Sequence, residues 1–187
     1  MIPIHLDLTD TQSIRDAVDT VQDAAGAIDV LVNCAGYGEF GSIEEADLGA
    51  ARAQLEVNVL SAMGLVQAVL PAMRERGHGR IVNVSSLAGE FAAPLGGWYH
   101  ASKFALEALS DSLRGEVAGF GIDVTLVQPS YVATDWHTTA LDRLEATSGK
   151  APTLRWPRRC GATSPAPHSV GRRPAWGLSR RSWRRPR

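Results

Sequence analysis

The 187-residue chain is 44% hydrophobic and 21% charged, with a formal net charge of −1, which excludes a wholly disordered chain, a collagen-like repeat and a disulfide scaffold. No apolar run reaches the roughly 18 residues of a membrane helix, and the first residues do not read as a signal peptide. Two cysteines without metal-like spacing, Cys34 and Cys160, predict no metal site, and we expect a cytoplasmic location without a membrane partner.

Short apolar runs alternate with helical periodicity over residues 2–135. Continuous apolar runs predict strands at Ile2–Leu6, Ile28–Asn33, Gly79–Val84 and Gly121–Gln128. Helical spacing of apolar residues predicts helices at Ile14–Val21, Leu55–Met73 and Ala105–Val117. Strands that alternate with long helices predict an α/β fold, with a parallel sheet covered on both faces.

The composition changes abruptly after Lys150. The last 37 residues hold 10 of the 19 basic residues, all arginine, and none of the 20 acidic ones. We therefore predict a folded domain at residues 1–150 and a disordered Arg-, Pro- and Trp-rich tail at 151–187. Arginines interleaved with aromatic residues can bind nucleic acid. The abrupt break favours instead a tail of foreign origin, such as a shifted reading frame, so nucleic acid is not the expected partner.

A glycine-rich stretch, Gly36-Tyr-Gly38-Glu-Phe-Gly41, matches G-x-G-x-x-G and follows a predicted strand. As a phosphate-binding turn it should open a helix whose N-terminus faces the phosphate. Glu44 and Glu45 place two negative charges at that point. We interpret the stretch as a turn whose glycines permit tight backbone geometry.

Polar residues fall near the ends of successive predicted strands. Tyr99 and Lys103, four residues apart at the start of a helix, share one helix face. Ser86 follows the strand Gly79–Val84, and Asn58 lies on the helix before that strand. Because parallel strands end at one edge of a sheet, where α/β folds bind ligands, we expect serine, tyrosine and lysine to converge there.

In this order the motifs resemble those of the short-chain dehydrogenase/reductase superfamily, over about residues 1–145. The matching segments are Asp7-Leu-Thr-Asp10, Asn33-Cys-Ala-Gly36, Glu56-Val-Asn-Val59, Val82-Asn-Val-Ser-Ser86, Tyr99-His-Ala-Ser-Lys103 and Pro129-Ser-Tyr-Val-Ala-Thr134. The resemblance implies a Rossmann-like doubly wound parallel sheet and an NAD or NADP cofactor. It also implies hydride transfer between that cofactor and a small-molecule alcohol or carbonyl substrate.

The resemblance assigns roles to individual residues. Tyr99 would be the acid/base, Lys103 would lower the pKa of Tyr99 and bind the nicotinamide ribose, and Ser86 would hold the substrate oxygen. Asn58 would hold a water of the proton relay. Cofactor contacts would come from Asp7, Leu8, Asn33, Ala35, Gly36, Tyr99, Lys103, Pro129 and Thr134.

Structural roles are the alternatives at some of these positions. Asn58 would stabilise a helix, Ser86 would be a turn residue at a strand end, and Thr134 would cap a helix. We interpret Cys34 as a small buried residue.

The chain also departs from the family pattern. It begins at what resembles the third strand, so we expect a truncated member without the first strand–helix–strand unit and its glycine-rich pyrophosphate turn. The strand Ile28–Asn33 is then an exposed apolar edge. Two alternatives to an active enzyme follow: an inactive fragment that keeps only self-association through its two long helices, and nucleic-acid binding through the tail.

Overall fold

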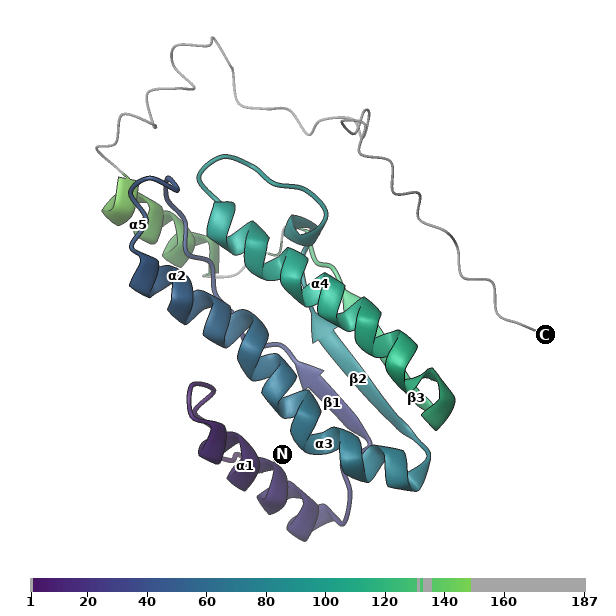
Figure 1. The fold of residues 1–187 in the computed structure, drawn as a ribbon. Coiled ribbons are helices and arrows are strands. Elements are labelled where there is room, and N and C mark those ends of the chain that lie inside the picture. The colour runs from purple at the N-terminus through teal and green to yellow at the C-terminus, as the bar shows by residue number, and fades with distance from the viewer. Residues whose placement is uncertain (1, 131, 133–135, 149–187) are drawn as a thin grey trace, which may run out of the picture. The chain divides into compact units, whose positions relative to one another are not determined.

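Three parallel strands form the sheet of this computed structural model, which describes residues 2–130, 132 and 136–148. The strands β1 (Val30–Asn33), β2 (Gly79–Val84) and β3 (Ile122–Val127) lie in the order β1–β2–β3 (Figure 1). The register pairs Asn33 with Asn83 and Val84 with Val127, so the strands end at one edge of the sheet. The predicted α/β class and the strands near 28–33, 79–84 and 121–128 are confirmed.

Helices connect and follow these strands. They are α1 (Thr11–Ala25), α2 (Leu48–Leu55), α3 (Ser61–Arg76), α4 (Gly97–Val117) and α5 (Trp136–Ser148), with short 3-10 turns η2 (Leu87–Gly89) and η3 (Ala118–Phe120). One π-helical turn, η1 (Glu56–Leu60), joins α2 to α3, so the helix predicted around Asn58 is longer than expected and changes its winding at that residue. Carboxylates begin two of the helices: Asp10 caps α1 and Asp47 caps α2.

The core lies between the sheet and the helices α3 and α4, with α1 packed on α3. Met73 and Ile81 are completely buried at its centre. Burial of each such side chain contributes about 1.5–3 kcal/mol. The buried cluster is made of Val18, Val66, Val69, Met73, Ile81, Leu113, Val117, Ile122 and Val124.

The helical stretch Leu48–Arg76 has the length and the mean hydropathy, 1.4, of a membrane span. Its residues Val66, Val69 and Met73 form part of the core described above. Since core helices of globular proteins share this length and composition, the feature does not indicate a membrane location.

In the described part of the chain, helices cover one face of the sheet only, which differs from the expected two covered faces. The helices α1, α3 and α4 lie on the same side (Figure 1). On the other face, Val30 and Val32 of β1 are 53% and 56% exposed. The strand β1 is also a sheet edge, as predicted for Ile28–Asn33.

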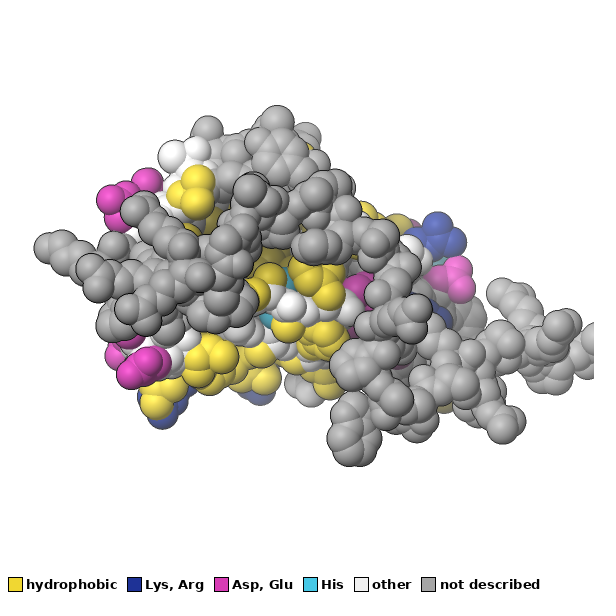
Figure 2. Space-filling model, turned by 90° about the horizontal axis from the view of Figure 1, so that it is seen from above, with side chains coloured by type: hydrophobic (Ala, Val, Ile, Leu, Met, Phe, Trp, Pro, Cys, Tyr) yellow, Lys and Arg dark blue, Asp and Glu magenta, His cyan; other side chains and the backbone are white. Residues whose placement is uncertain are grey.

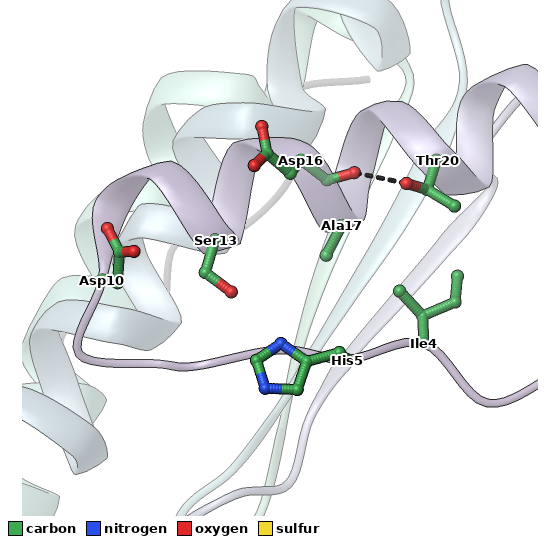
Figure 3. Close-up of a pocket in the computed structure, with 7 residues that line it drawn as sticks. All are labelled: Ile4, His5, Asp10, Ser13, Asp16, Ala17 and Thr20. Atoms are coloured by element: carbon green, nitrogen blue, oxygen red, sulfur yellow. Dashed lines mark hydrogen bonds between the residues drawn. The ribbon is translucent and has the colours of Figure 1, made fainter.

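The strand predicted at Ile2–Leu6 is wrong. This segment is extended but pairs with no described strand, and it runs beside α1, as Figure 3 shows for Ile4 and His5. Ile2 is 81% exposed. An apolar run becomes a strand only where a neighbouring strand accepts its backbone hydrogen bonds, and the described residues offer none there.

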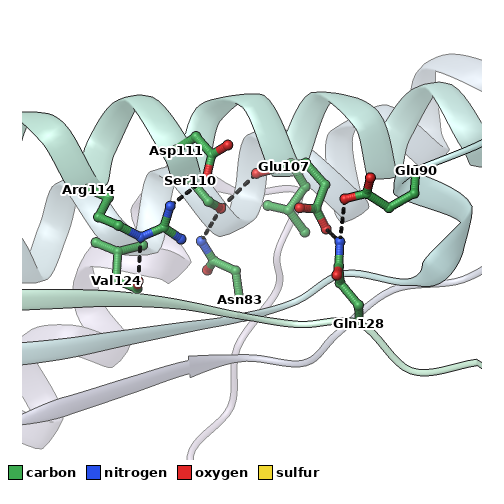
Figure 4. Close-up of polar contacts among 9 residues, drawn as sticks. Asn83, Glu90, Glu107, Ser110, Asp111, Arg114, Val124 and Gln128 are labelled. Carbon is green, nitrogen blue, oxygen red and sulfur yellow. Dashed lines mark hydrogen bonds and ion pairs between the residues drawn. The ribbon is translucent and has the colours of Figure 1, made fainter. Parts of the chain in front are cut away.

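Polar contacts hold α4 against the ends of the strands (Figure 4). The buried Asn83 Nδ2 of β2 donates to Ser110 Oγ of α4 over 2.8 Å. Beyond β3, Gln128 Nε2 donates to carboxylate oxygens of Glu90 and Glu107, each over 2.9 Å. The middle of α4, at Glu107 and Ser110, is therefore held against the carboxyl-terminal parts of β2 and β3.

Candidate active site

A cavity of about 590 Å³ opens where the strands end. Its walls come from the residues after β1, from η2 and the loop that follows it, from the first turns of α4, and from the chain between β3 and α5. Predicted site residues in its lining are Gly36, Ser86, Tyr99, Lys103 and Pro129. Figure 2 looks onto this end of the molecule, where hydrophobic side chains gather in the centre of the view.

Tyr99, Ser86 and Lys103 lie together on this cavity wall, as expected from the strand ends. The side chain of Ser86 lies near enough to that of Tyr99 to lower the pKa of the tyrosine. Ser86 also caps η2, because its Oγ accepts a hydrogen bond from the Ala88 N–H over 3.1 Å. Lys103, one helical turn after Tyr99, has its Nζ 6.0 Å from the centre of the tyrosine ring.

The pKa values of this group are set mainly by burial. Burial raises the pKa of Tyr99 above its usual value, and the Ser86 side chain opposes that rise. Burial lowers the pKa of Lys103 to about 8, with the charges of Cys34 and Glu107 acting in the opposite direction. In the chain without cofactor, the contribution that lowers the pKa of Tyr99 comes from Ser86.

Lys103 is positioned by one backbone contact. Its Nζ donates to the Val84 carbonyl oxygen over 3.0 Å, at the very end of β2, and the residue is only 5% exposed. An ammonium group has three donors, so this contact leaves two N–H bonds for other acceptors.

Asn58 sits in the π turn with its amide fully engaged. Its Oδ1 accepts from the Tyr37 N–H over 3.0 Å, and its Nδ2 donates to the Tyr37 carbonyl oxygen over 2.8 Å and to Ser102 Oγ over 3.1 Å. Gln54, one turn earlier, donates to the same Tyr37 carbonyl over 3.1 Å. The amide group of Asn58 therefore clamps the loop backbone beside Gly36, whereas its structural alternative expected a contact that stabilises a helix.

The residues near Gly36 and Lys103 fit the nicotinamide–ribose end of a dinucleotide. A Cβ atom at Gly36 would make a tight contact of 3.1 Å with Asn58 Oδ1 and an ordinary one of 3.7 Å with Lys103 Nζ, so the glycine leaves space beside both groups. The two remaining N–H bonds of Lys103 suit ribose hydroxyls. The N-termini of α1 and α2 do not suit a pyrophosphate, because the carboxylates of Asp10 and Asp47 occupy them.

Other predicted cofactor residues lie away from the cavity lining. Asp7 is exposed in the turn before α1, where hydrogen bonds from Thr9 lower the pKa of its carboxyl, and Leu8 is half-buried beside it. Ala35 is exposed between two lining residues. Thr134 lies outside the described residues.

Asn33 joins elements of the core. It is 8% exposed, and its Nδ2 donates to Asn83 Oδ1 over 2.9 Å and to the Ala62 carbonyl oxygen over 3.3 Å. These contacts tie the end of β1 to β2 and α3, so Asn33 supports the edge at which the cavity opens.

The glycine-rich stretch is a turn region, as predicted, and it opens no helix. Its glycines allow close approach to α5: a Cβ atom at Gly38 would lie 2.8 Å from the Trp136 ring, and one at Gly41 would lie 2.6 Å from Thr147 Cγ2. Glu39 Oε2, between them, accepts from Arg143 Nη1 over 2.7 Å. The glycine-rich stretch therefore forms the surface against which α5 packs.

Several lining residues were not found from the sequence. Cys34 is exposed with a free thiol in the cavity wall, so its interpretation as a buried residue is wrong. The other lining residues that were not predicted as site residues are Phe40, Val84, Ser85, Leu87, Ala88, Phe91, Ala93, His100, Ser130, Val132 and Trp136. A signal existed for Val84, Ser85, His100 and Ser130, which lie within the motifs that carry the family resemblance, whereas most of the others are apolar residues in segments without periodicity.

A second cavity, of about 440 Å³, lies between the N-terminal segment and α1 (Figure 3). Ile4 and His5 line one side and Asp10, Ser13 and Asp16 the other. It contains none of the predicted catalytic residues.

Comparisons with known proteins agree with this fold. The family model of the short chain dehydrogenases matches residues 1–144, so the chain belongs to that family. A probable short-chain type dehydrogenase/reductase of Helicobacter pylori, VdlC, is 35% identical over 142 residues, which cover 76% of this chain and 52% of that protein. The chain spans about half the length of the curated relatives it matches.

Solved structures show the same architecture. A gluconate 5-dehydrogenase of Burkholderia cenocepacia, in complex with NADP and tartrate, is 29% identical with a TM-score of 0.69, over 81% of this chain and 56% of that one. An NAD⁺-bound xylitol dehydrogenase is 31% identical with a TM-score of 0.69, over 72% of this chain and 53% of that one. The members of the family that resemble this chain thus include both NADP- and NAD-bound enzymes.

Proposed function

We propose that this chain supplies the catalytic half of an oxidoreductase that transfers a hydride between NAD or NADP and an alcohol or carbonyl compound. The observation that carries the proposal is the juxtaposition of Tyr99, Ser86 and Lys103 on the wall of one cavity. Family membership and the cofactors bound by the similar solved enzymes support it.

Each side chain has a defined task in this chemistry. The bound nicotinamide supplies or accepts the hydride. Tyr99 donates the proton that the developing oxyanion needs, and takes it back in the reverse direction. Ser86 donates a hydrogen bond to the same oxygen. Lys103 holds the ribose hydroxyls and places its positive charge beside the tyrosine ring, which favours the tyrosinate form once the site is filled.

An inactive member of the family is the alternative. The acidic caps of α1 and α2 favour it, since neither helix end offers a site for the pyrophosphate. In that case the chain would act only through self-association. Exposed apolar residues on α4, Phe104 and Leu109, are 44% and 40% accessible and would supply such a contact. A sedimentation experiment that shows only monomer at all concentrations would exclude self-association as the function of the chain.

A fluorescence titration of the purified chain with NADH and NADPH distinguishes the active enzyme from the inactive alternative. The active form should bind at least one nicotinamide saturably and then reduce a panel of ketones. Tyr99→Phe should keep cofactor binding and lower the reduction rate by at least about a hundredfold, the lower end of the range for general acid catalysis. No binding to a chain shown to be folded would support the inactive alternative.

A further inference from the structure

We infer that the substrate of this cavity is an uncharged, mainly apolar ketone or secondary alcohol that presents one oxygen atom to the wall. The inference rests on the proposed function, because Tyr99 and Ser86 are the groups that receive this oxygen. It goes beyond that function by excluding polyols and carboxylated ketones as substrates of the same site.

Aromatic rings surround the reactive tyrosine. The centre of the Phe40 ring lies 5.5 Å from that of Tyr99, and the centre of the Trp136 ring lies 5.2 Å from it. Phe40 and Trp136 meet each other edge to face at 6.0 Å. On the other side Phe91 lies 5.4 Å from the ring of His100. A substrate whose oxygen reaches Tyr99 therefore places its carbon skeleton among aromatic side chains.

His100 offers this substrate no hydrogen bond. Its Nδ1 lies 2.9 Å from the Ala88 carbonyl oxygen, and its Nε2 lies 3.2 Å from the Ala93 backbone nitrogen. A carbonyl only accepts and an N–H only donates, so Nδ1 carries the proton and Nε2 accepts. Both ring nitrogens are thereby used, and the imidazole meets the cavity as a neutral ring.

Lys103 supplies the cationic side chain of the described lining. Its ammonium group lies in the part of the cavity that we assign to the cofactor. Its Nζ is held by the Val84 carbonyl oxygen and lies beside Gly36 and Cys34. No arginine lines this cavity within the described residues. A substrate carboxylate placed among Phe40, Phe91 and Trp136 would thus lose its water without gaining a counter-charge.

Hydroxyl groups on the carbon skeleton of a substrate would also lose hydration when they enter this cavity. Each hydroxyl that lies against the rings of Phe40 and Phe91 gives up water, and these two side chains offer it neither a donor nor an acceptor. The loss weakens binding by roughly tenfold or more for each unpaired group. The apolar side chains of the cavity wall therefore disfavour the binding of polyhydroxylated compounds, and this effect does not depend on the catalytic step.

Three small ketones of similar size test the inference: cyclohexanone, dihydroxyacetone and pyruvate. Their binding to the full chain, with and without NADH or NADPH, is measured by ligand-observed NMR titration. We expect cyclohexanone to bind at least about tenfold more tightly than either of the others. Equal or tighter binding of dihydroxyacetone or pyruvate, or no binding of cyclohexanone, overturns the inference.

Substitutions at two phenylalanines test whether cyclohexanone binds among the aromatic side chains of the cavity. Phe91, in the cavity wall, is 54% exposed, and Phe104, on α4 outside the lining, is 44% exposed. Phe91→Ser should weaken cyclohexanone binding by roughly fivefold or more, and Phe104→Ser should leave it unchanged. Equal effects of the two substitutions would contradict binding among the aromatic side chains. If Phe91→Ser does not fold, Phe91→Leu, which keeps an apolar side chain, should retain the preference for cyclohexanone.

Turnover is scored separately from binding. Cyclohexanone that binds selectively but is not reduced with either cofactor would contradict the proposed function and leave the cavity's selectivity intact. Reduction of dihydroxyacetone in preference to cyclohexanone would support the proposed function and overturn this inference.

Discussion

Lys103 is an ammonium group buried at the end of β2 with one backbone acceptor, the Val84 carbonyl. Removal of its charge from water lowers its pKa from 10.5 to about 8. The folded protein therefore releases this proton at a lower pH than the unfolded chain does. Between these two values the unfolded chain binds more protons, so the free energy of unfolding rises with pH.

We expect Lys103→Met to abolish this dependence. Relative to the variant, the original chain should gain on the order of 3 kcal/mol of stability as the pH rises from about 8 to 10.5, the interval by which burial lowers the pKa of the lysine. Below the folded pKa the cost of the buried charge is fully present, so the variant should be at least as stable there. Urea unfolding at a series of pH values measures the difference; parallel pH profiles would contradict it.

Asn58 supports the site through the backbone of Tyr37, to which its amide makes two hydrogen bonds. Asn58→Leu leaves the Tyr37 N–H without that acceptor, so we expect a loss of about 1–3 kcal/mol in the free energy of unfolding. Gln54→Met is the matched control, because Asn58 would still hold the Tyr37 carbonyl and Gln54 Oε1 has no hydrogen-bond partner to lose. Denaturant unfolding of the two variants should rank them in this order; equal losses would be inconsistent with the clamp.

The positions of side chains near the strand ends could be predicted from the sequence. The residues that form the rest of the cavity wall could not. Ser86, Tyr99 and Lys103 could be brought together because the order of strands and helices decides where a strand end or a first helical turn lies. The aromatic wall depends on how loops return over the sheet, and no periodicity encodes the positions of Phe40 or Phe91. The exposed thiol of Cys34 was misjudged for the same reason.

Among the elements, strands with partners on the sheet were predictable, whereas Ile2–Leu6 was not a strand. Its apolar residues would suit a strand, but the described part of the chain supplies no strand to pair with it. The π turn at Glu56–Leu60 also escaped prediction, since the spacings of three and four residues between its apolar neighbours are equally those of an uninterrupted α-helix. Local pattern thus determines the type of an element, and its neighbours determine whether the element forms.

The docking of α5 on the glycine-rich stretch gives a prediction at this scale. Gly41→Ala would place a methyl group 2.6 Å from Thr147 Cγ2, and the resulting overlap should cost about 1–3 kcal/mol. The helix should then separate from the stretch more often and expose Arg143, which is paired with Glu39. Trypsin cleavage after Arg143 should become faster.

Thr147→Ser removes the methyl group that Gly41→Ala meets, so it provides the matched rescue. Cleavage of the double variant should return toward the original rate, while Thr147→Ser alone should change it little. Failure of the second substitution to slow the cleavage would show that the overlap is not the cause.

For the whole molecule, the sequence predicted two helical layers, but in the described part the helices lie on one face. The prediction came from the general behaviour of parallel sheets, which need cover on both faces because their side chains are apolar on both. The other face carries Val30 and Val32, and β1 has no described neighbour on its outer side. An exposed edge strand with apolar side chains is a template for pairing with another chain.

We therefore expect the chain to self-associate through β1 as concentration rises. Val32→Lys should reduce this association, because a charge on an edge strand opposes pairing, and the 56% exposed side chain should affect the free energy of unfolding by less than about 0.5 kcal/mol. Leu141→Lys is the control: Leu141 is 62% exposed but lies on α5, which has no unpaired strand edge. Light scattering over a concentration series compares the variants, and an equal reduction by both lysines would mean that general charge repulsion, and not the strand edge, controls the association.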